Sequence, residues 1–359
     1  EFFQEKEEKE KSIILSKINE IEERIQRDEG NRGIKEILLP QGELYNAAKS
    51  LLPKKRIAII TGFPCLLDYT PPTETDGPLG AVAIAKTLIE LEKEVVILTD
   101  ECNEEPLLAS VAGAGLSSPL LLLESFPSRN DFEDEDFIRL EALSRTFDAV
   151  IAIERAGPSH DGICRTMRGF DMNHLVAPLE LLFIPPNTET DNINEIVNEL
   201  ENDEENIDLI HPNLSLPLTT IGIGDGGNEV GMGKIYDTII QSKISNATQI
   251  ACTVASDYLI TSSVSNWGGY ALAASIALVW LESNPIINDR NEEINEEDNF
   301  KKILQKLIPT EEEQLESCKS LVAAGARDGI LKTQDLFVDG MPIESSLLVL
   351  REIREIALK

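Results

Sequence analysis

Short apolar runs alternate with amphipathic segments through the middle of the chain. Several of these runs predict strands, because a strand that is covered on both faces of a sheet is apolar along its whole length. They lie at 56–62, 94–100, 148–154, 218–224, 249–254 and 257–264, and 119–126 is a further candidate. Helical spacing of apolar residues predicts helices at 79–93, 136–146 and 266–282. Strands that alternate with helices indicate an α/β fold: a three-layer, mostly parallel, doubly wound (Rossmann-like) sheet with helices on both faces.

The two ends of the chain predict additional helices. Apolar residues at helical spacing indicate N-terminal helices at 1–28 and 43–52. We therefore expect an N-terminal helical extension, residues 1–55, packed on the core. Residues 56–330 would form the α/β domain, and residues 331–359 would end in a C-terminal helix. Two helices are expected within 311–357, around turns at 325–330 (GARDGI) and 339–342 (DGMP).

The charge balance narrows the choice of partners. The chain has 359 residues, with 64 acidic and 32 basic side chains, and therefore a formal net charge of −32. This excess disfavours nucleic acids and anionic membranes, because like charges repel one another. We expect a small-molecule partner, no nucleic acid and no membrane, with a homo-oligomer left open.

Cysteine usage and hydropathy indicate the compartment. The five cysteines are scattered and form no CxxC pair, which disfavours a disulfide framework and fits a reducing compartment. We recognise no secretory leader, and the longest apolar run, 267–280, is shorter than the ~18 residues of a membrane span. We expect a cytoplasmic protein, with the mitochondrial matrix as the alternative.

Two acidic segments look like insertions into the α/β domain. Residues 186–213 contain nine acidic side chains and no Lys or Arg, and residues 282–300 contain seven acidic side chains and one Arg. Together they carry −15 of the net −32. Because both are rich in Asn and poor in aromatic residues, we predict solvated loops or frayed helices there rather than binding sites.

Four polar clusters follow predicted strands, where doubly wound sheets bind their ligands. The first cluster, 61–81, contains Glu74 and Asp76, which would face this cleft if the loop folds over the strand end. The alternative is that Thr75 or Asp76 only caps the helix that follows.

The second cluster, 153–169, gathers Arg155, Arg165 and Arg168 in an otherwise acidic protein. A guanidinium group binds a carboxylate through two parallel hydrogen bonds, so Arg155 and Arg168 are candidates to hold an anionic substrate. The alternative is a set of salt bridges with no role in binding. His160, beside an aspartate, could exchange protons, but a lone loop histidine is more often incidental.

The third cluster, 219–234, is rich in glycine, and part of it fits the GxGxxG pattern of dinucleotide-binding loops. We reject that function, because no acidic residue follows about 20 positions later and because Asp225 and Glu229 would repel a pyrophosphate. The backbone amides suit a substrate carboxylate, whereas the two acids suit an ammonium group or a hard cation. The remaining candidates are Gly224, Gly226, Gly227 and Asn228. Alternatively, the glycines serve tight turns and the acids cap them.

The fourth cluster, 262–274, offers Ser265 and Asn266 as caps of the next helix or, alternatively, as ligand contacts. The sequence has no GxSxG, GxxxxGK[ST] or HExxH motif. No His is close enough in sequence to activate Cys65, so we expect it to be a small buried residue. Because the candidate ligands are oxygen atoms, any metal would be Mg²⁺ or Ca²⁺ rather than zinc.

Taken in order, these clusters resemble the C-terminal domain of the D-glutamate cyclase family. The resemblance runs from NRG (31–33) to GARDG (325–329), and the two acidic segments depart from it. Its motifs are GFP (62–64), PPTETDGPLGA (71–81), IERAG (153–157), DG (161–162), TMRG (166–169), GIGDGGNEVGMG (222–233) and SNWGGYAL (265–272). The resemblance implies a carbon–oxygen lyase that cyclises D-glutamate to 5-oxo-D-proline with loss of water, and it makes residues 56–330 the catalytic domain.

The chemistry of this ring closure suggests roles for the candidate residues. Glu229 or Asp225 would deprotonate the substrate ammonium, and Asp76 or Glu74 would protonate the leaving hydroxyl, while the two arginines hold the carboxylates. Alternatively, Asp225 and Glu229 bind a divalent cation, Mg²⁺ or Ca²⁺. Two other functions stay open: an α/β enzyme that uses a nucleotide or phosphorylated ligand, and a non-catalytic protein that binds acidic amino acids.

Overall fold

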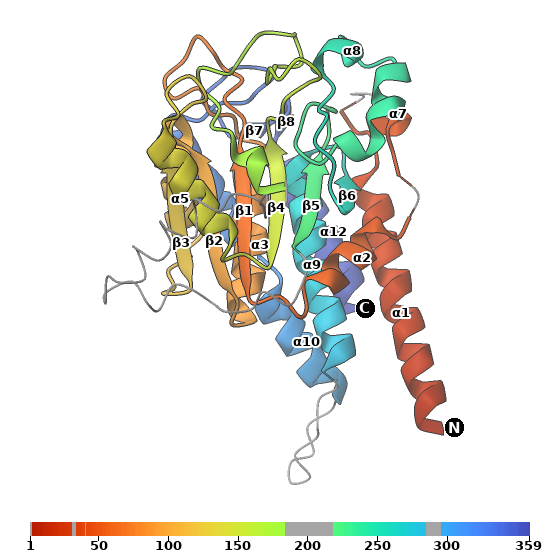
Figure 1. The fold of residues 1–359 in the computed structure, drawn as a ribbon. Helices are drawn as coiled ribbons and strands as arrows, with labels where there is room; N and C mark the ends of the chain where they lie inside the picture. The colour runs from red at the N-terminus through yellow and green to blue at the C-terminus, as the bar shows by residue number, and fades with distance from the viewer. Residues whose placement is uncertain (1, 31–33, 40, 184–217, 285–295) are drawn as a thin grey trace, which may run out of the picture.

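The computed structural model describes residues 2–30, 34–39, 41–183, 218–284 and 296–359 (Figure 1). A parallel sheet of six strands lies at the centre, in the order β3-β2-β1-β4-β5-β6. The strands are β1 (Arg56–Gly62), β2 (Glu94–Asp100), β3 (Leu121–Phe126), β4 (Ala149–Arg155), β5 (Thr219–Gly224) and β6 (Tyr258–Thr261). The direction in which strands are added reverses between β1 and β4, and such a reversal is where doubly wound sheets bind ligands.

Helices cover one face of the sheet in several layers. α3 (Pro78–Glu90) and α9 (Ser265–Ser283) pack on the sheet and on each other. They approach closely at Gly269, where a Cβ would lie only 2.5 Å from the backbone of Gly80. Further helices are α1 (Phe2–Ile25), α2 (Glu43–Ser50), α4 (Glu104–Gly113), α7 (Tyr236–Gln241), α8 (Ala247–Ile250), α10 (Glu296–Leu307), α11 (Glu311–Ala323) and α12 (Ile343–Leu358).

The opposite face of the sheet carries a thinner layer in the described part of the chain. There α5 (Asp134–Ser144) and the 3₁₀ helix η3 (Leu179–Phe183) pack on the apolar side chains of β1, β2 and β4. The shorter elements are η1 (Ile34–Glu36), η2 (Glu101–Asn103), η5 (Gly233–Ile235) and a hairpin of β7 (Phe337–Val338) and β8 (Met341–Pro342). Helices on both faces of a parallel sheet confirm the predicted three-layer α/β fold.

The ends of the chain are helical, as predicted, and pack on the same face. α1 contacts α9 and α12, and buries Ile18, Ile21 and Ile25 completely. The acidic segment 186–213 and most of 282–300 lie outside the described residues; the rest of 282–300 forms the end of α9 and the start of α10. The domain boundaries stay predictions. Among the described helices, none is long and apolar enough to cross a membrane.

One predicted strand is wrong. Residues 249–254 form the end of α8 and an irregular stretch rather than a strand. The carbonyl oxygen of Val254 accepts hydrogen bonds from the backbone amides of Gly231 and Gly233, at 2.9 and 3.0 Å. The apolar side chains of this stretch are therefore buried against the glycine-rich loop, which produces the same apolar run as a strand in the sheet. Helices α4, α7, α8 and α10 were not predicted.

Candidate functional site

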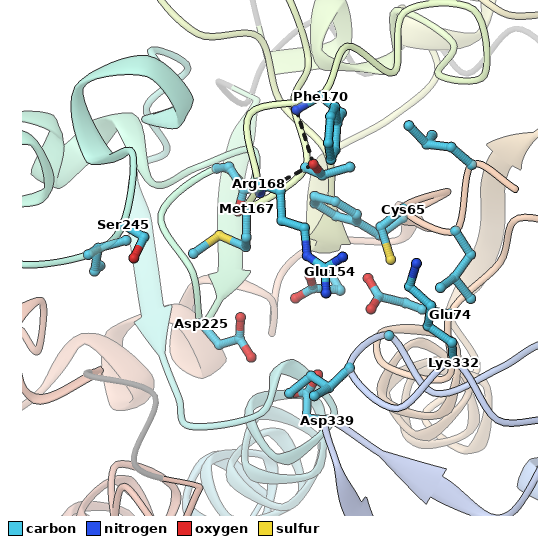
Figure 2. Close-up of a pocket in the computed structure, with 18 of the residues that line it drawn as sticks. Cys65, Glu74, Glu154, Met167, Arg168, Phe170, Asp225, Ser245, Lys332 and Asp339 are labelled. Carbon is cyan, nitrogen blue, oxygen red and sulfur yellow. Dashed lines mark hydrogen bonds between the residues drawn. The ribbon is translucent and has the colours of Figure 1, made fainter.

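The loops gather at the carboxyl ends of the strands (Figure 1). A cavity of about 720 Å³ opens among them (Figure 2). Its wall comes from the loops that follow β1, β4 and β5, together with the segment between α11 and the β7–β8 hairpin. The first two of these loops lie at the reversal of strand order. The cavity is therefore where this topology places a ligand.

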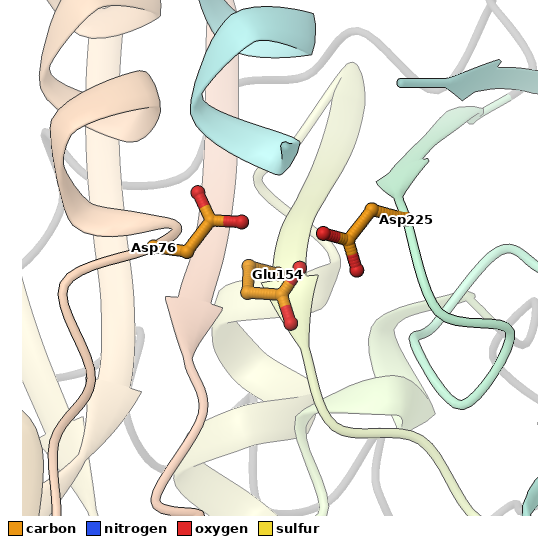
Figure 3. A group of neighbouring side chains, drawn as sticks. All are labelled: Asp76, Glu154 and Asp225. Atoms are coloured by element: carbon orange, nitrogen blue, oxygen red, sulfur yellow. The ribbon is translucent and has the colours of Figure 1, made fainter. Parts of the chain in front are cut away.

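Three acidic side chains from different loops converge beside this cavity, and two of them, Glu154 and Asp225, line it. Asp76 comes from the loop after β1, Glu154 from the end of β4 and Asp225 from the loop after β5 (Figure 3). One carboxylate oxygen of each lies within 4.8 Å of the others, and all three residues are buried. We refer to Asp76, Glu154 and Asp225 as the carboxylate cluster. Because buried carboxylates repel one another when all are ionised, such a cluster favours binding of a proton or a cation.

Glu154 is the member of this cluster that was not predicted. Thr61 of β1 pairs with Ile153, and Gly62 pairs with Arg155, so Glu154 is an extra residue that forms a β-bulge. Its backbone is left-handed, with φ 40°. A bulge redirects a side chain, and bulges are frequent beside active sites. The only sequence signal was a carboxylate at the end of an apolar strand, next to the arginine that was chosen instead.

The surroundings of Glu154 favour its protonated form. Burial raises the pKa of Glu154 well above its usual range, and the nearby carboxylates of Asp225, Glu229 and Asp76 raise it further. The hydroxyl of Ser265 donates a hydrogen bond to Oε2 of Glu154 at 2.5 Å. Ser265, predicted as a cap or a ligand contact, thus lies against the carboxylate cluster.

Asp76 and Asn266 cap each other's helices. The carboxylate of Asp76 accepts hydrogen bonds from the backbone amides of Ser265 and Asn266, both at 2.8 Å, and so caps α9. The side-chain oxygen of Asn266 accepts from the amides of Gly77 and Gly80 at 3.0 and 2.8 Å, and so caps α3. The sequence predicted that Ser265 or Asn266 would cap its own helix, α9. Neither side chain does so. Asn266 is fully buried away from the cavity lining, so its role is structural.

The glycine-rich loop is closed around its own glutamate. Glu229 is fully buried, and its carboxylate accepts hydrogen bonds from the amides of Asp225, Gly226 and Gly227, at 3.0, 2.6 and 2.6 Å. These are the amides predicted to bind a substrate carboxylate, so the prediction for Glu229, Gly226 and Gly227 is corrected. The carbonyl oxygen of Gly224 accepts from the amide of Ser262. These three amides already donate to Glu229, so they are not available to a phosphate, which argues against a nucleotide ligand at this loop.

Two residues of this loop still face the cavity. Asp225 lines it with its carboxylate, and Asn228 lines it while its side-chain nitrogen donates to the carbonyl oxygen of Arg165 at 2.8 Å. The metal ligands predicted from the sequence were Asp225 and Glu229. The structure groups Asp225 with Asp76 and Glu154 instead, because the Glu229 carboxylate is already bound by the backbone.

The three arginines of the second cluster differ in their partners and in whether they line the cavity. Arg155 is fully buried and forms two hydrogen bonds with the carboxylate of Asp100, at 2.6 and 2.7 Å, and a third with the carbonyl oxygen of Ala177. Arg155 does not line the cavity, which corrects its predicted role in substrate binding. Arg165 is paired with Asp161 at 2.6 Å.

Arg168 lines the cavity, and its side chain reaches into it (Figure 2). Within the described residues its guanidinium group has no hydrogen bond or ion pair. Among the three arginines of the cluster, Arg168 is therefore the one that offers its charge to a ligand.

The opposite wall of the cavity adds residues that the sequence left unassigned. Glu74 lines the cavity, as predicted, beside Cys65. Burial raises the pKa of the Cys65 thiol well above its usual range, and the Glu74 carboxylate raises it further, so this thiol is not a nucleophile at neutral pH. Lys332 and Asp339 come from the C-terminal segment, where the sequence indicated only turns. The lining thus combines six acidic with three basic side chains, which suits a ligand that carries both charges.

Comparison with known proteins agrees with the resemblance seen in the motifs. A family model described as "D-glutamate cyclase-like, C-terminal" matches residues 21–199 and 187–354. The chain is also 33% identical, over 270 residues, to human "D-glutamate cyclase, mitochondrial". This match covers 74% of the chain but only 39% of the human protein. The chain belongs to the D-glutamate cyclase-like C-terminal family.

Proposed function

We propose that this protein is a lyase that cyclises D-glutamate to 5-oxo-D-proline with loss of water. The observation that carries the proposal is the carboxylate cluster beside a cavity lined by Arg168, whose guanidinium group has no ion pair within the described residues. A zwitterionic dicarboxylate matches this pairing, because its ammonium would face acids and a carboxylate would face the arginine. Membership of the family supports the same reaction.

In this reaction the α-amine attacks the carbon of the γ-carboxyl group. Asp225 takes one proton from the substrate ammonium, and Glu154 protonates the γ-carboxylate. The C–N bond then forms, and the nitrogen returns its second surplus proton to Glu154. The hydroxyl leaves as water with the proton held by Asp225, so both carboxyl groups end in their starting states.

Glu154 replaces Asp76 as the proton donor in this scheme. The oxygens of Asp76 already accept the amide hydrogens of Ser265 and Asn266, which ties this residue to helix capping. Burial and the neighbouring carboxylates raise the pKa of Glu154 and so favour its protonated form, which suits it to donate a proton to the substrate. Arg168 would bind a substrate carboxylate and stabilise the tetrahedral oxyanion. Holding the substrate in the bent conformation supplies a further part of the rate.

As an alternative to this proton-transfer scheme, the carboxylate cluster is our candidate site for a divalent cation. Three carboxylate oxygens within 4.8 Å of one another form a hard donor set that suits Mg²⁺ or Ca²⁺. Such a cation would polarise the γ-carboxyl group. Calorimetric titration of the chelator-treated protein with each ion tests this. A binding heat that the unmodified protein gives and the Asp225→Asn variant does not give would support the cation site. No binding heat with the unmodified protein would exclude it.

Chiral chromatography tests the reaction itself. The protein is incubated with D-glutamate and, separately, with L-glutamate, each with EDTA, Mg²⁺ or Ca²⁺, beside a protein-free control. We expect 5-oxo-D-proline to form from D-glutamate above the spontaneous rate. Formation no faster than in the control, in every arm, would reject the proposal. D-glutamate binding without product would instead indicate a non-catalytic protein that binds acidic amino acids.

Location and assembly are separate proposals. The name of the human relative places that protein in mitochondria. For this chain we keep the cytoplasm as the proposed location and the mitochondrial matrix as the alternative. Fractionation of cells that express the full-length protein decides between them. Light scattering of the purified chain tests whether it forms a homo-oligomer.

A further inference from the structure

The C-terminal segment between α11 and the β7–β8 hairpin is built into the cavity wall. The amide of Thr75 donates a hydrogen bond to the carbonyl oxygen of Arg327 at 3.0 Å. The amide of Arg327 donates one to the carbonyl oxygen of Thr73 at 3.1 Å. The hydroxyl of Thr75 donates to the carbonyl oxygen of Phe337 at 2.7 Å. These bonds fix the segment to the loop that carries Glu74 and Asp76.

Lys332 is held at this wall in an unfavourable backbone conformation. Its φ is 61°, a left-handed value that an unbranched L-residue seldom adopts outside tight turns. Lys332 lies at the end of a turn that the fully buried Asp328 maintains. The carboxylate of Asp328 accepts hydrogen bonds from the backbone amides of Ile330, Leu331 and Gly340. The amide of Lys332 also donates to the carbonyl oxygen of Asp328 at 2.9 Å. These bonds fix the position of the Lys332 backbone in the cavity wall.

The charge of Lys332 is available to a ligand. Its side chain lines the cavity, and in Figure 2 it lies across the cavity from Asp225. In the described part of the chain, its ammonium group takes part in no hydrogen bond or ion pair. Lys243, the other lysine of the lining, lies 3.5 Å from Glu36 and its side chain is 91% exposed. Among the residues that the structure describes, Lys332 and Arg168 are therefore the two cationic groups of the lining without an ion pair.

We propose that Lys332 binds one carboxylate of a dicarboxylic amino acid while Arg168 binds the other, so that the pair selects acidic amino acids over their amides. The proposal rests on the proposed function, because it concerns the same cavity. An acidic lining repels a dicarboxylate except where cations face it, and Arg155 is not available. The two carboxylates of the ligand match, in number and in charge, the two cationic groups that have no ion pair within the described residues.

The test compares three variants with the unmodified protein. Lys332→Gly removes the side chain and relieves the left-handed backbone, Lys332→Arg keeps the charge, and Lys243→Met is the matched control in the same lining. Calorimetry measures the affinity for D-glutamate and for glutarate. For Lys332→Gly we expect both affinities to fall by about tenfold or more without a lower melting temperature. Lys332→Arg should keep most of the affinity, and Lys243→Met should keep all of it.

Analogues identify the carboxylate that Lys332 binds. D-glutamine lacks the γ-carboxylate and 4-aminobutyrate lacks the α-carboxylate. We expect one of them to bind Lys332→Gly and the unmodified protein equally, because its missing group is the partner of the lysine. Equal losses for both analogues and D-glutamate, or no loss for any ligand, would overturn the proposal.

The outcomes also separate this inference from the proposed reaction. If the unmodified protein binds D-glutamate but forms no 5-oxo-D-proline, the proposed reaction fails, and the affinities alone still decide the role of Lys332. If it binds neither D-glutamate nor glutarate, the inference is wrong.

Discussion

Two buried glutamates at the ends of neighbouring strands, Glu229 and Glu154, lie in opposite surroundings. The carboxylate of Glu229 accepts hydrogen bonds from three backbone amides of its own loop, which stabilise its charge. Glu154 accepts one hydroxyl hydrogen and has carboxylates on several sides. Both are nearly inaccessible to solvent, so burial does not distinguish them. Their hydrogen-bond partners and neighbouring charges distinguish them. Glu229 stabilises the fold, whereas the surroundings of Glu154 favour a protonated form that can exchange its proton.

Two arginines, Arg155 and Arg168, show the same contrast between a side chain paired within the fold and one that faces the cavity. Arg155 forms a two-pronged ion pair with Asp100 inside the protein, whereas Arg168 points into the cavity without an ion pair in the described residues. The number of acids or bases in a loop therefore says little about ligand binding. The decisive property is which of them the fold leaves without a partner.

The largest effect should come from Glu154→Gln. This change keeps the size of the side chain and removes the proton that we assign to the γ-carboxyl step, so turnover of D-glutamate should fall by up to about 10⁴-fold. Affinity for D-glutamate and the melting temperature should change little. Glu124→Gln, at a distant carboxylate of β3, is the control. Turnover within a few-fold of the unmodified protein would remove Glu154 from the chemistry.

Next, Arg155→Met and Arg168→Met should separate stability from binding. Arg155→Met leaves the buried carboxylate of Asp100 without its cationic partner and should lower the free energy of unfolding by about 3–5 kcal/mol. Arg168→Met should leave stability within about 0.5 kcal/mol and weaken D-glutamate binding instead. Urea unfolding and calorimetry measure the two quantities. A large stability loss in Arg168→Met would contradict the contrast between them.

Glu229→Gln should have a smaller effect, chiefly on stability. The amide side chain cannot accept from all three backbone groups as the carboxylate does, so we expect a loss of about 2–3 kcal/mol in the free energy of unfolding. Glu316→Gln, at an exposed ion pair, is the matched control and should change little. If Glu229→Gln abolished turnover at unchanged stability, the glutamate would belong to the chemistry after all.

The smallest effect is a pH dependence of stability. Because the pKa of Glu154 is higher in the folded protein than its ordinary value, its protonated form contributes stability that is complete below about pH 4.5 and is lost as the pH rises through the folded pKa. Relative to Glu154→Gln, the unmodified protein should lose up to about 1.4 kcal/mol per pH unit in that interval. Urea unfolding with EDTA present measures this. A pH-independent difference would show that the carboxyl group titrates normally.

The fold was predictable because buried strands have a simple sequence signature. β1 and β4 are buried at every position, and their apolar runs mark them without ambiguity. The same rule failed at 249–254, where the apolar residues pack against the glycine-rich loop rather than within the sheet. A local run of apolar residues does not report what covers it.

The site was predictable only as a set of loops. The ends of β1, β4 and β5 were correct places to search, but the residues within them depend on contacts between distant parts of the chain. Asp100, the partner of Arg155, is 55 positions away on another strand. Glu154 enters the cavity because of a bulge, and no spacing rule predicts one. Lys332 reaches the site through a segment that has no apolar pattern of its own.

The mutual capping of α3 and α9 has an electrostatic consequence. The backbone dipoles of each helix sum to roughly half a positive charge at the N-terminus, and both N-termini meet at Asp76. Together they place on the order of one elementary charge beside the carboxylate cluster. The fold thus neutralises part of the cluster before any ligand arrives. A single ammonium group, rather than a set of counter-ions, is enough to bring the site close to charge balance.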